Sequence, residues 1–60
     1  MISLKEAREN ACLTQREVVD KAGISITTYS RIENGKQKPR PSTRRVIVKI
    51  LKVKPADISW

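Results

Sequence analysis

Residues 14–35, TQREVVDKAGISITTYSRIENG, decide the fold, because they predict two short helices separated by a glycine. Thr14 begins the first helix, and Glu17 follows at the three-residue spacing of a capping box. Gly23 ends this helix, since glycine adopts the positive φ that often follows a helix end. Ser25 comes two residues later and can cap a second helix. The stretch therefore predicts helices over residues 15–22 and 25–33.

The contact between these two helices is supported by the pattern of apolar residues. Five positions need apolar side chains, and all five have apolar or aromatic ones: Val18, Ala22, Ile24, Tyr29 and Ile32. Asn34-Gly35 is a strong turn signal and ends the second helix. Two helices joined by a short turn that contains glycine form a helix-turn-helix arrangement.

Helical patterns also flank this segment on both sides. Ser3 can cap a helix in which Leu4 and Ala7 face inward, and Glu6 has the capping-box spacing. After a basic loop with two prolines, Ser42 can cap a fourth helix that runs to about Lys52. Its inward-facing residues are Ile47, Ile50 and Leu51.

A short fifth helix is predicted over residues 55–58, because Pro55 suits the first position of a helical turn. No segment shows the alternation of a strand. The prediction is an all-α, compact five-helix bundle that forms one domain over residues 1–60, with helices 2 and 3 as the helix-turn-helix.

No targeting or membrane segment is expected. No apolar run approaches the roughly 18 residues of a membrane span. Residues 1–10 are charged and lack the apolar stretch of a signal peptide. A cytoplasmic protein without membrane contact is the resulting expectation.

The residues of catalytic and metal sites are scarce. The chain has no histidine and a single cysteine, Cys12. Zinc sites draw on several Cys, His or carboxylate ligands, and histidine is the usual base beside a nucleophile. We therefore expect no metal site, no cofactor, no small-molecule substrate and no enzyme. Cys12 is interpreted as a loop or surface residue, with redox sensing as the alternative.

The charge is unevenly distributed along the chain. The net charge is +7, yet residues 1–30 carry four basic and four acidic side chains. Residues 31–54 carry nine basic side chains and one acid, Glu33. Such a block is typical of a surface that binds a polyanion. A solubilising surface and a basic amphipathic membrane helix are the alternatives, but the apolar residues near the fourth helix are needed for the core.

Residues 4–39, LKEARENACLTQREVVDKAGISITTYSRIENGKQKP, resemble the phage-repressor and Cro-like helix-turn-helix family of the Xre type. The run Ser30–Lys36 carries the resemblance most strongly, and the tail RPSTRRVIVKILKVKPADI is similar to the family's fourth and fifth helices. The chain departs from the family at Val19, where alanine is usual, and at Arg44, where a leucine or valine is common. The second departure suggests a more exposed start of the fourth helix.

The resemblance implies that the third helix lies in the major groove of DNA and reads bases. The matching base-reading positions are Ile26, Thr27, Ser30 and Arg31. An arginine can donate two hydrogen bonds to guanine, and an apolar side chain can contact a thymine methyl group. For Ile26 the alternative is a core position, and for Arg31 it is a phosphate contact or a solvated side chain.

The resemblance also implies contacts with the DNA backbone and one structural ion pair. Gln15, at the start of the second helix, matches a phosphate contact, with N-terminal solvation as the alternative. Four further polar residues follow the third helix, where phosphate contacts set the register: Asn34, Lys36, Lys38 and Arg40. Their alternative role is a solubilising loop. Arg8 and Glu33 match a pair that the family joins between its first and third helices.

The expected function is that of a transcriptional regulator, more often a repressor than an activator, that binds a double-stranded DNA operator. The family often binds paired half-sites, so a homodimer on DNA is implied. Ile58 and Trp60 either contribute to a dimer contact or close the core. The alternatives are an antitoxin that binds its own operator and a toxin, and a protein-interaction adaptor of the same fold.

Overall fold

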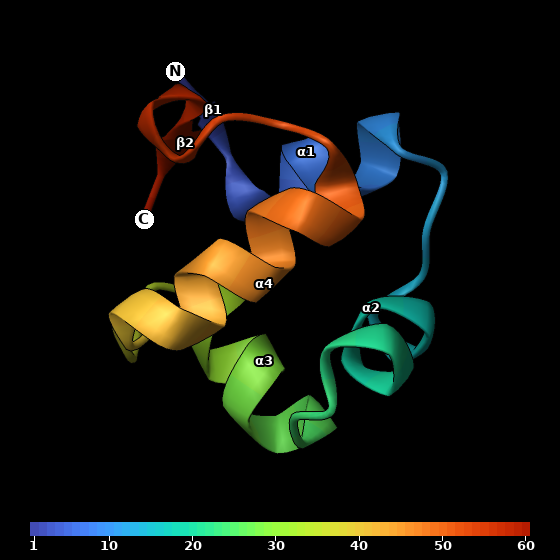
Figure 1. Ribbon diagram of the computed structural model, residues 1–60. Helices are drawn as coiled ribbons and strands as arrows, with labels where there is room; N and C mark the ends of the chain where they lie inside the picture. The colour runs from blue at the N-terminus through green and yellow to red at the C-terminus, as the bar shows by residue number, and fades with distance from the viewer.

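The computed structural model describes residues 1–60 and places four α-helices around one core (Figure 1). In chain order the elements are β1 (Ile2–Ser3), α1 (Leu4–Asn10), α2 (Gln15–Ala22), α3 (Ile26–Glu33), α4 (Pro41–Leu51), the 3-10 turn η1 (Pro55–Asp57) and β2 (Ile58–Ser59). The longest helix has 11 residues, and no helix has the length and hydrophobicity of a membrane span.

Short polar side chains define the starts of the first three helices. Ser3 Oγ accepts the Glu6 amide at 3.1 Å, and Ser25 Oγ accepts the Thr28 amide at 3.1 Å. Thr14 and Glu17 form a complete capping box, in which each side chain accepts the other residue's backbone N–H. Because these contacts satisfy amides that a helix leaves free at its start, they determine where α1, α2 and α3 begin.

The turn between α2 and α3 depends on Gly23. This residue has a φ of 70° and a ψ of 31°, in the left-handed region that glycine adopts without a steric penalty. Its N–H donates to the Val19 carbonyl at 2.8 Å and closes the last turn of α2. The predicted helix-turn-helix is therefore present, with α3 beginning at Ile26 directly after its cap, Ser25.

The core combines residues from every helix and from β2. Tyr29, Ile47 and Val18 are its largest fully buried side chains. They pack with the rest of one apolar cluster: Leu4, Ala7, Val19, Ile32, Leu51 and Ile58. Val19, which departs from the resembled family, is only 5% exposed and lies within this cluster. The α2 side chains thus fill the space between α3 and α4.

One prediction about α4 is wrong, and the predicted set of inward-facing residues is incomplete. Ser42 does not cap this helix; Arg40 is the N-cap without a side-chain hydrogen bond, and Pro41 occupies the first turn. The fixed φ of proline and its missing N–H suit that position. Val48, which was not predicted to face inward, is buried, whereas Ile50 is half-buried at the edge of the core.

The expectation of five helices without strands is also wrong at the chain's end. Residues 55–57 form one 3-10 turn, in which the Asp57 amide donates to the Lys54 carbonyl at 3.0 Å. Beyond it, β2 pairs in parallel with β1, Ile2 opposite Ile58, so the two ends of the chain lie side by side (Figure 1). Strands of two residues are too short to show the alternation from which strands are predicted.

Ile58 and Trp60 close the core, so the alternative of a dimer contact is not supported for Ile58. Ile58 is 3% exposed within its own chain. Trp60 is half-buried against the core, and its indole N–H donates to the Pro55 carbonyl at 3.2 Å. The guanidinium of Arg44 lies 5.4 Å from the centre of the Trp60 ring, within the range of a cation–π contact. Arg44 is therefore half-buried, whereas Pro41 and Ser42 at the start of α4 are exposed, as the departure from the family suggested.

Candidate functional site

The α3 helix presents two opposite faces. Tyr29 and Ile32 are buried and hold one face against the core. The other face carries the four predicted base-reading residues, which helical geometry places on one side: Ile26, Thr27, Ser30 and Arg31. Ile26 is 42% exposed, so its alternative role as a core residue is ruled out. An apolar side chain in contact with solvent at this place is available for a ligand.

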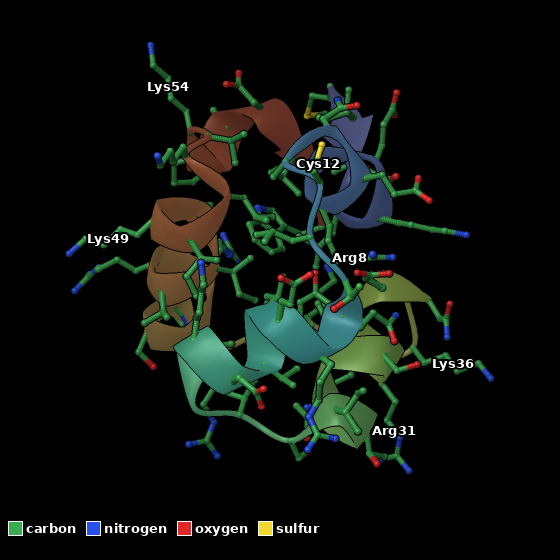
Figure 2. The ribbon with its side chains drawn as sticks, turned by 90° about the vertical axis from the view of Figure 1, so that its right-hand side faces the viewer. Arg8, Cys12, Arg31, Lys36, Lys49 and Lys54 are labelled. Atoms are coloured by element: carbon green, nitrogen blue, oxygen red, sulfur yellow. The ribbon has the colours of Figure 1, made fainter.

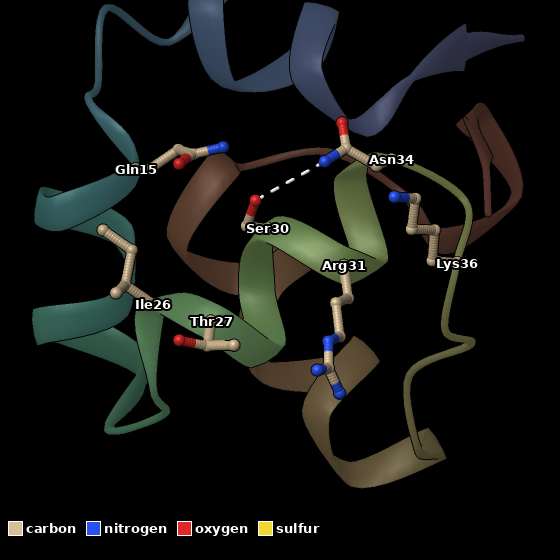
Figure 3. A pocket seen from close by; sticks show the side chains of 7 residues that line it. All are labelled: Gln15, Ile26, Thr27, Ser30, Arg31, Asn34 and Lys36. Atoms are coloured by element: carbon tan, nitrogen blue, oxygen red, sulfur yellow. Dashed lines mark hydrogen bonds between the residues drawn. The ribbon is translucent and has the colours of Figure 1, made fainter.

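The exposed face of α3 forms the floor of an open hollow of about 420 Å³ (Figure 3). Seven residues line it, from the start of α2, from α3 and from the segment after α3: Gln15, Ile26, Thr27, Ser30, Arg31, Asn34 and Lys36. All seven were predicted as nucleic-acid contacts. The tertiary structure thus joins the four base-reading positions and three of the five phosphate positions in one surface.

Lys38 and Arg40 lie outside the hollow. Both are exposed in the segment that leads to α4, and the buried Pro39 separates them. Because Pro39 anchors this segment to the body of the protein, Lys38 and Arg40 form a basic extension of the surface beyond Lys36. The structure does not bring these two residues onto the exposed face of α3.

Gln15 is tied to the third helix by its side chain. Its Nε2 donates to Glu33 Oε1 at 3.1 Å, which joins the start of α2 to the end of α3. Gln15 still lines the hollow, beside backbone N–H groups that a helix start leaves without intrahelical partners. Sequence reasoning missed this hydrogen bond, because no spacing rule relates two residues 18 positions apart.

Arg8 and Glu33 form an ion pair directly behind the hollow. Arg8 Nε donates to Glu33 Oε2 at 2.7 Å, and Arg8 Nη2 donates to Glu33 Oε1 at 3.4 Å. Their side chains are only 12% and 3% exposed. Arg8 Nη1 also donates to the Leu13 carbonyl at 2.8 Å, which braces the turn between α1 and α2. The pair therefore holds α1, α2 and α3 in place.

The hydrogen bonds keep Glu33 ionised. Burial by itself would raise the pKa of Glu33, but the hydrogen bonds from Arg8 and Gln15 outweigh it, and the pKa lies below its ordinary value. Burial also raises the pKa of the neighbouring Tyr29 phenol, whose hydroxyl is buried without a hydrogen-bond partner. Glu33 is the only acid among residues 31–54, and Arg8 neutralises it.

The surface around the hollow is therefore positive and offers hydrogen-bond donors. Arg31 and Lys36 stand at one side of it, and the Asn34 amide donates to Ser30 Oγ at 3.5 Å (Figure 3). No group of three or more His, Cys, Asp or Glu side chains that could hold a metal is present. Cys12 is exposed in the turn after α1, where its φ of 59° is left-handed. The arrangement is suited to contact with an extended anion.

Comparison with known proteins gives one result. A family model described as a helix-turn-helix domain matches residues 2–60. No curated protein and no solved structure matches the chain significantly. The matched range includes every element from β1 to β2 and all residues of the hollow.

Proposed function

The chain belongs to the helix-turn-helix domain family, and we propose that it is a sequence-specific regulator of transcription that binds double-stranded DNA. The observation that carries this proposal is the lining of the hollow. Exposed polar, basic and apolar side chains from α2 and α3 converge there, and the one nearby carboxylate is neutralised. The resemblance to phage repressors and Cro-like proteins of the Xre type supports the same function.

In this proposal α3 enters the major groove. The groove is about 12 Å wide and admits an α-helix. Arg31 would donate two hydrogen bonds to a guanine, Thr27 and Ser30 would donate or accept, and Ile26 would pack on a thymine methyl group. Because the opposite face of α3 is held by Tyr29 and Ile32, the reading side chains reach DNA from a rigid support.

Backbone phosphates would lie on both sides of the reading helix. Gln15 and the start of α2 stand on one side of α3, while Asn34 and Lys36 stand on the other (Figure 3). Lys38 and Arg40 would extend the second contact. These contacts fix the position of the domain on the duplex without reading sequence. We propose that the protein is a repressor and not an activator, because a domain bound across a promoter blocks transcription without any further contact.

Selection of bound duplexes from a random pool tests the proposal. The wild type should enrich a defined sequence, and Arg31→Ala should lose preference at one base pair, by about 1–3 kcal/mol. Ile26→Ala should lose preference at a different base pair, with a thymine expected there. Both variants should keep the wild-type melting temperature, since both side chains are exposed.

Two outcomes would contradict this assignment. A pool that shows no enrichment would overturn sequence-specific binding. An Arg31→Ala variant that weakens all duplexes equally would make Arg31 a phosphate contact and leave the reading to Thr27 and Ser30. If the selected sequence holds two half-sites about 34–36 Å apart, the domain binds as a dimer.

A further inference from the structure

The α4 helix carries a basic stripe that the proposed DNA contact does not use. Arg45 and Lys49 are four residues apart in α4, so helical geometry places them on one side, and Lys52 follows directly after the helix as its C-cap. All three are exposed. The ion pairs of the structure are Arg8–Glu33 and Arg16–Asp20, so none of the three has a carboxylate partner. We refer to these residues as the α4 stripe.

Lys49, in the middle of the α4 stripe, lies on the opposite side of the molecule from the hollow. In Figure 2, Lys49 and Lys54 extend away from one side of the protein, and Arg31 and Lys36 extend from the other. The molecule measures 24 × 22 × 19 Å. DNA has a persistence length of about 50 nm, so a duplex in contact with α3 cannot bend around a body of this size. Lys49 is therefore out of reach of the duplex that α3 is proposed to read.

Folding accounts for only part of this clustering of charge, since the C-terminal end of a helix favours cations such as Lys49 and Lys52. Like charges at helical neighbours destabilise a helix, and α4 has no acidic residue to offset them. From Asn34 to the end of the chain the only acid is Asp57. The apolar face of α4, with Ile47, Val48 and Leu51, is buried in the core. That face is thus not free to insert into a lipid surface, as an interfacial helix requires.

The spacing of the α4 stripe matches the phosphates of a nucleic acid. Four residues of helix separate Arg45 from Lys49, which corresponds to about 6 Å along α4 at 1.5 Å per residue. The phosphates along one strand of B-DNA advance about 3.4 Å per base pair along the axis. These two charges therefore span about two base pairs of one strand, and Lys52 extends the stripe beyond the end of the helix.

We propose that the α4 stripe binds the backbone of a second DNA duplex, so that one domain bridges two DNA segments. This inference rests on the proposed function for the first duplex. Binding by the stripe is independent of sequence, because it uses only charges that contact phosphates. Each contact releases counterions and makes the second binding event sensitive to salt.

A bridging assay tests the proposal. The selected operator duplex is fixed to beads and saturated with protein, and a fluorescent duplex of unrelated sequence is added. The wild type should retain the fluorescent duplex at low salt. Arg45→Gln/Lys49→Gln should reduce this retention about tenfold and lower the salt slope of the second binding event by about 2. Capture of the protein by the operator should change less than twofold.

Lys5→Gln/Lys21→Gln provides the matched control. It removes the same charge from exposed positions on α1 and α2 and should keep wild-type retention. Circular dichroism melts should show that both double variants are folded. Equal loss of retention in both would overturn the proposal, because net charge alone would then explain it. Unchanged retention in Arg45→Gln/Lys49→Gln would also overturn it, since a dimer that bridges through two α3 faces would behave in this way.

The remaining outcomes separate this inference from the proposed function. A wild type that captures the operator but retains no second duplex overturns the bridging role, even if an acidic protein binds the stripe. A protein that shows no sequence preference but still bridges unrelated duplexes overturns sequence-specific regulation and supports the stripe. If Arg45→Gln/Lys49→Gln loses operator capture and retention equally, the stripe belongs to the first interface and the proposal fails.

Discussion

At the end of α3, the carboxylate of Glu33 accepts hydrogen bonds from side chains of two other helices. Arg8 approaches from α1 at 2.7 Å and Gln15 from α2 at 3.1 Å. The position of α3 thus depends on one buried charge and its partners. Removing one partner of a buried ion pair leaves an uncompensated charge, which costs much more than the loss of an exposed pair.

We expect Arg8→Ala to lower the free energy of unfolding by about 3–5 kcal/mol. A domain of this size has about 3–9 kcal/mol in total, so this loss removes a third or more of its stability. Replacing both residues with apolar ones, as in Arg8→Met/Glu33→Leu, should recover part of the loss. Thermal and urea melts of the single and double variants give the coupling between the two sites.

The exposed pair Arg16–Asp20 serves as the control for this comparison of single and double variants. Its side chains are 75% and 66% exposed at a distance of 3.4 Å. Arg16→Ala should therefore cost no more than about 1 kcal/mol. If the Arg8 and Glu33 substitutions prove fully additive, the ion pair does not couple α1 to α3 in solution.

The pH dependence of stability should also report on Glu33. Its pKa in the folded state lies below the ordinary value of 4.5. Its contribution is thus present above about pH 4.5 and is lost as the pH falls through the folded-state pKa. The melting temperature of the wild type should fall on acidification. Glu33→Gln should melt below the wild type at pH 7, and this deficit in melting temperature should shrink below pH 4.5. A deficit that stays constant down to pH 3 would contradict this assignment.

At the scale of elements, the turn between α2 and α3 decides the angle between the two helices. Gly23 lies in the left-handed region, and a Cβ at this position would meet no atom within 4 Å. A substitution therefore acts through backbone conformation alone and not through a clash. The left-handed conformation costs other residues about 1–2 kcal/mol.

Gly23→Ala should lower stability by about 1–2 kcal/mol, whereas Gly23→Asn should lose less, because asparagine tolerates this conformation. A change to glycine at a left-handed position can be made in the turn after α1, where Cys12 has a φ of 59°. Cys12→Gly should keep or raise the melting temperature. Denaturant melts of the three variants provide the comparison, and a Gly23→Ala variant as stable as the wild type would show that the turn relaxes.

At the scale of the whole molecule, the uneven charge should make DNA binding strongly dependent on salt. The proposed DNA-binding surface carries Arg31, Lys36, Lys38 and Arg40, while the acids of residues 1–30 lie on α1 and α2. If about four to six phosphates are neutralised, the plot of log K against log salt should have a slope of about −4 to −5. A flat titration would contradict the electrostatic basis of the interface.

Lys36→Ala should reduce that slope by about 1 and weaken binding to all duplexes alike. The side chain is exposed and lines the hollow, so the fold should be unaffected. Fluorescence anisotropy at several salt concentrations measures both the slope and the affinity. A change of sequence preference in Lys36→Ala would instead place this residue on a base edge.

Local signals in the sequence were sufficient for the starts of the first three helices and for the exposed face of α3. Caps at Ser3, Thr14 and Ser25 and the break at Gly23 depend on residues within a few positions, so they could be predicted. The exposed face of α3 follows from helical periodicity once Tyr29 and Ile32 are assigned to the core. The sequence therefore determined three helix starts and the helix-turn-helix, while the resemblance to a known family supplied the candidate contacts, of which seven line the hollow and Lys38 and Arg40 do not.

Only the tertiary structure decided the contacts between distant segments. The pairing of Ile2 with Ile58, the hydrogen bond from Gln15 to Glu33 and the stacking of Arg44 on Trp60 join residues 16 to 56 positions apart. Such contacts depend on how the helices pack, and no local pattern encodes packing. The same holds for the place of the α4 stripe, because periodicity aligns Arg45 with Lys49 but only the packed core places Lys49 opposite α3.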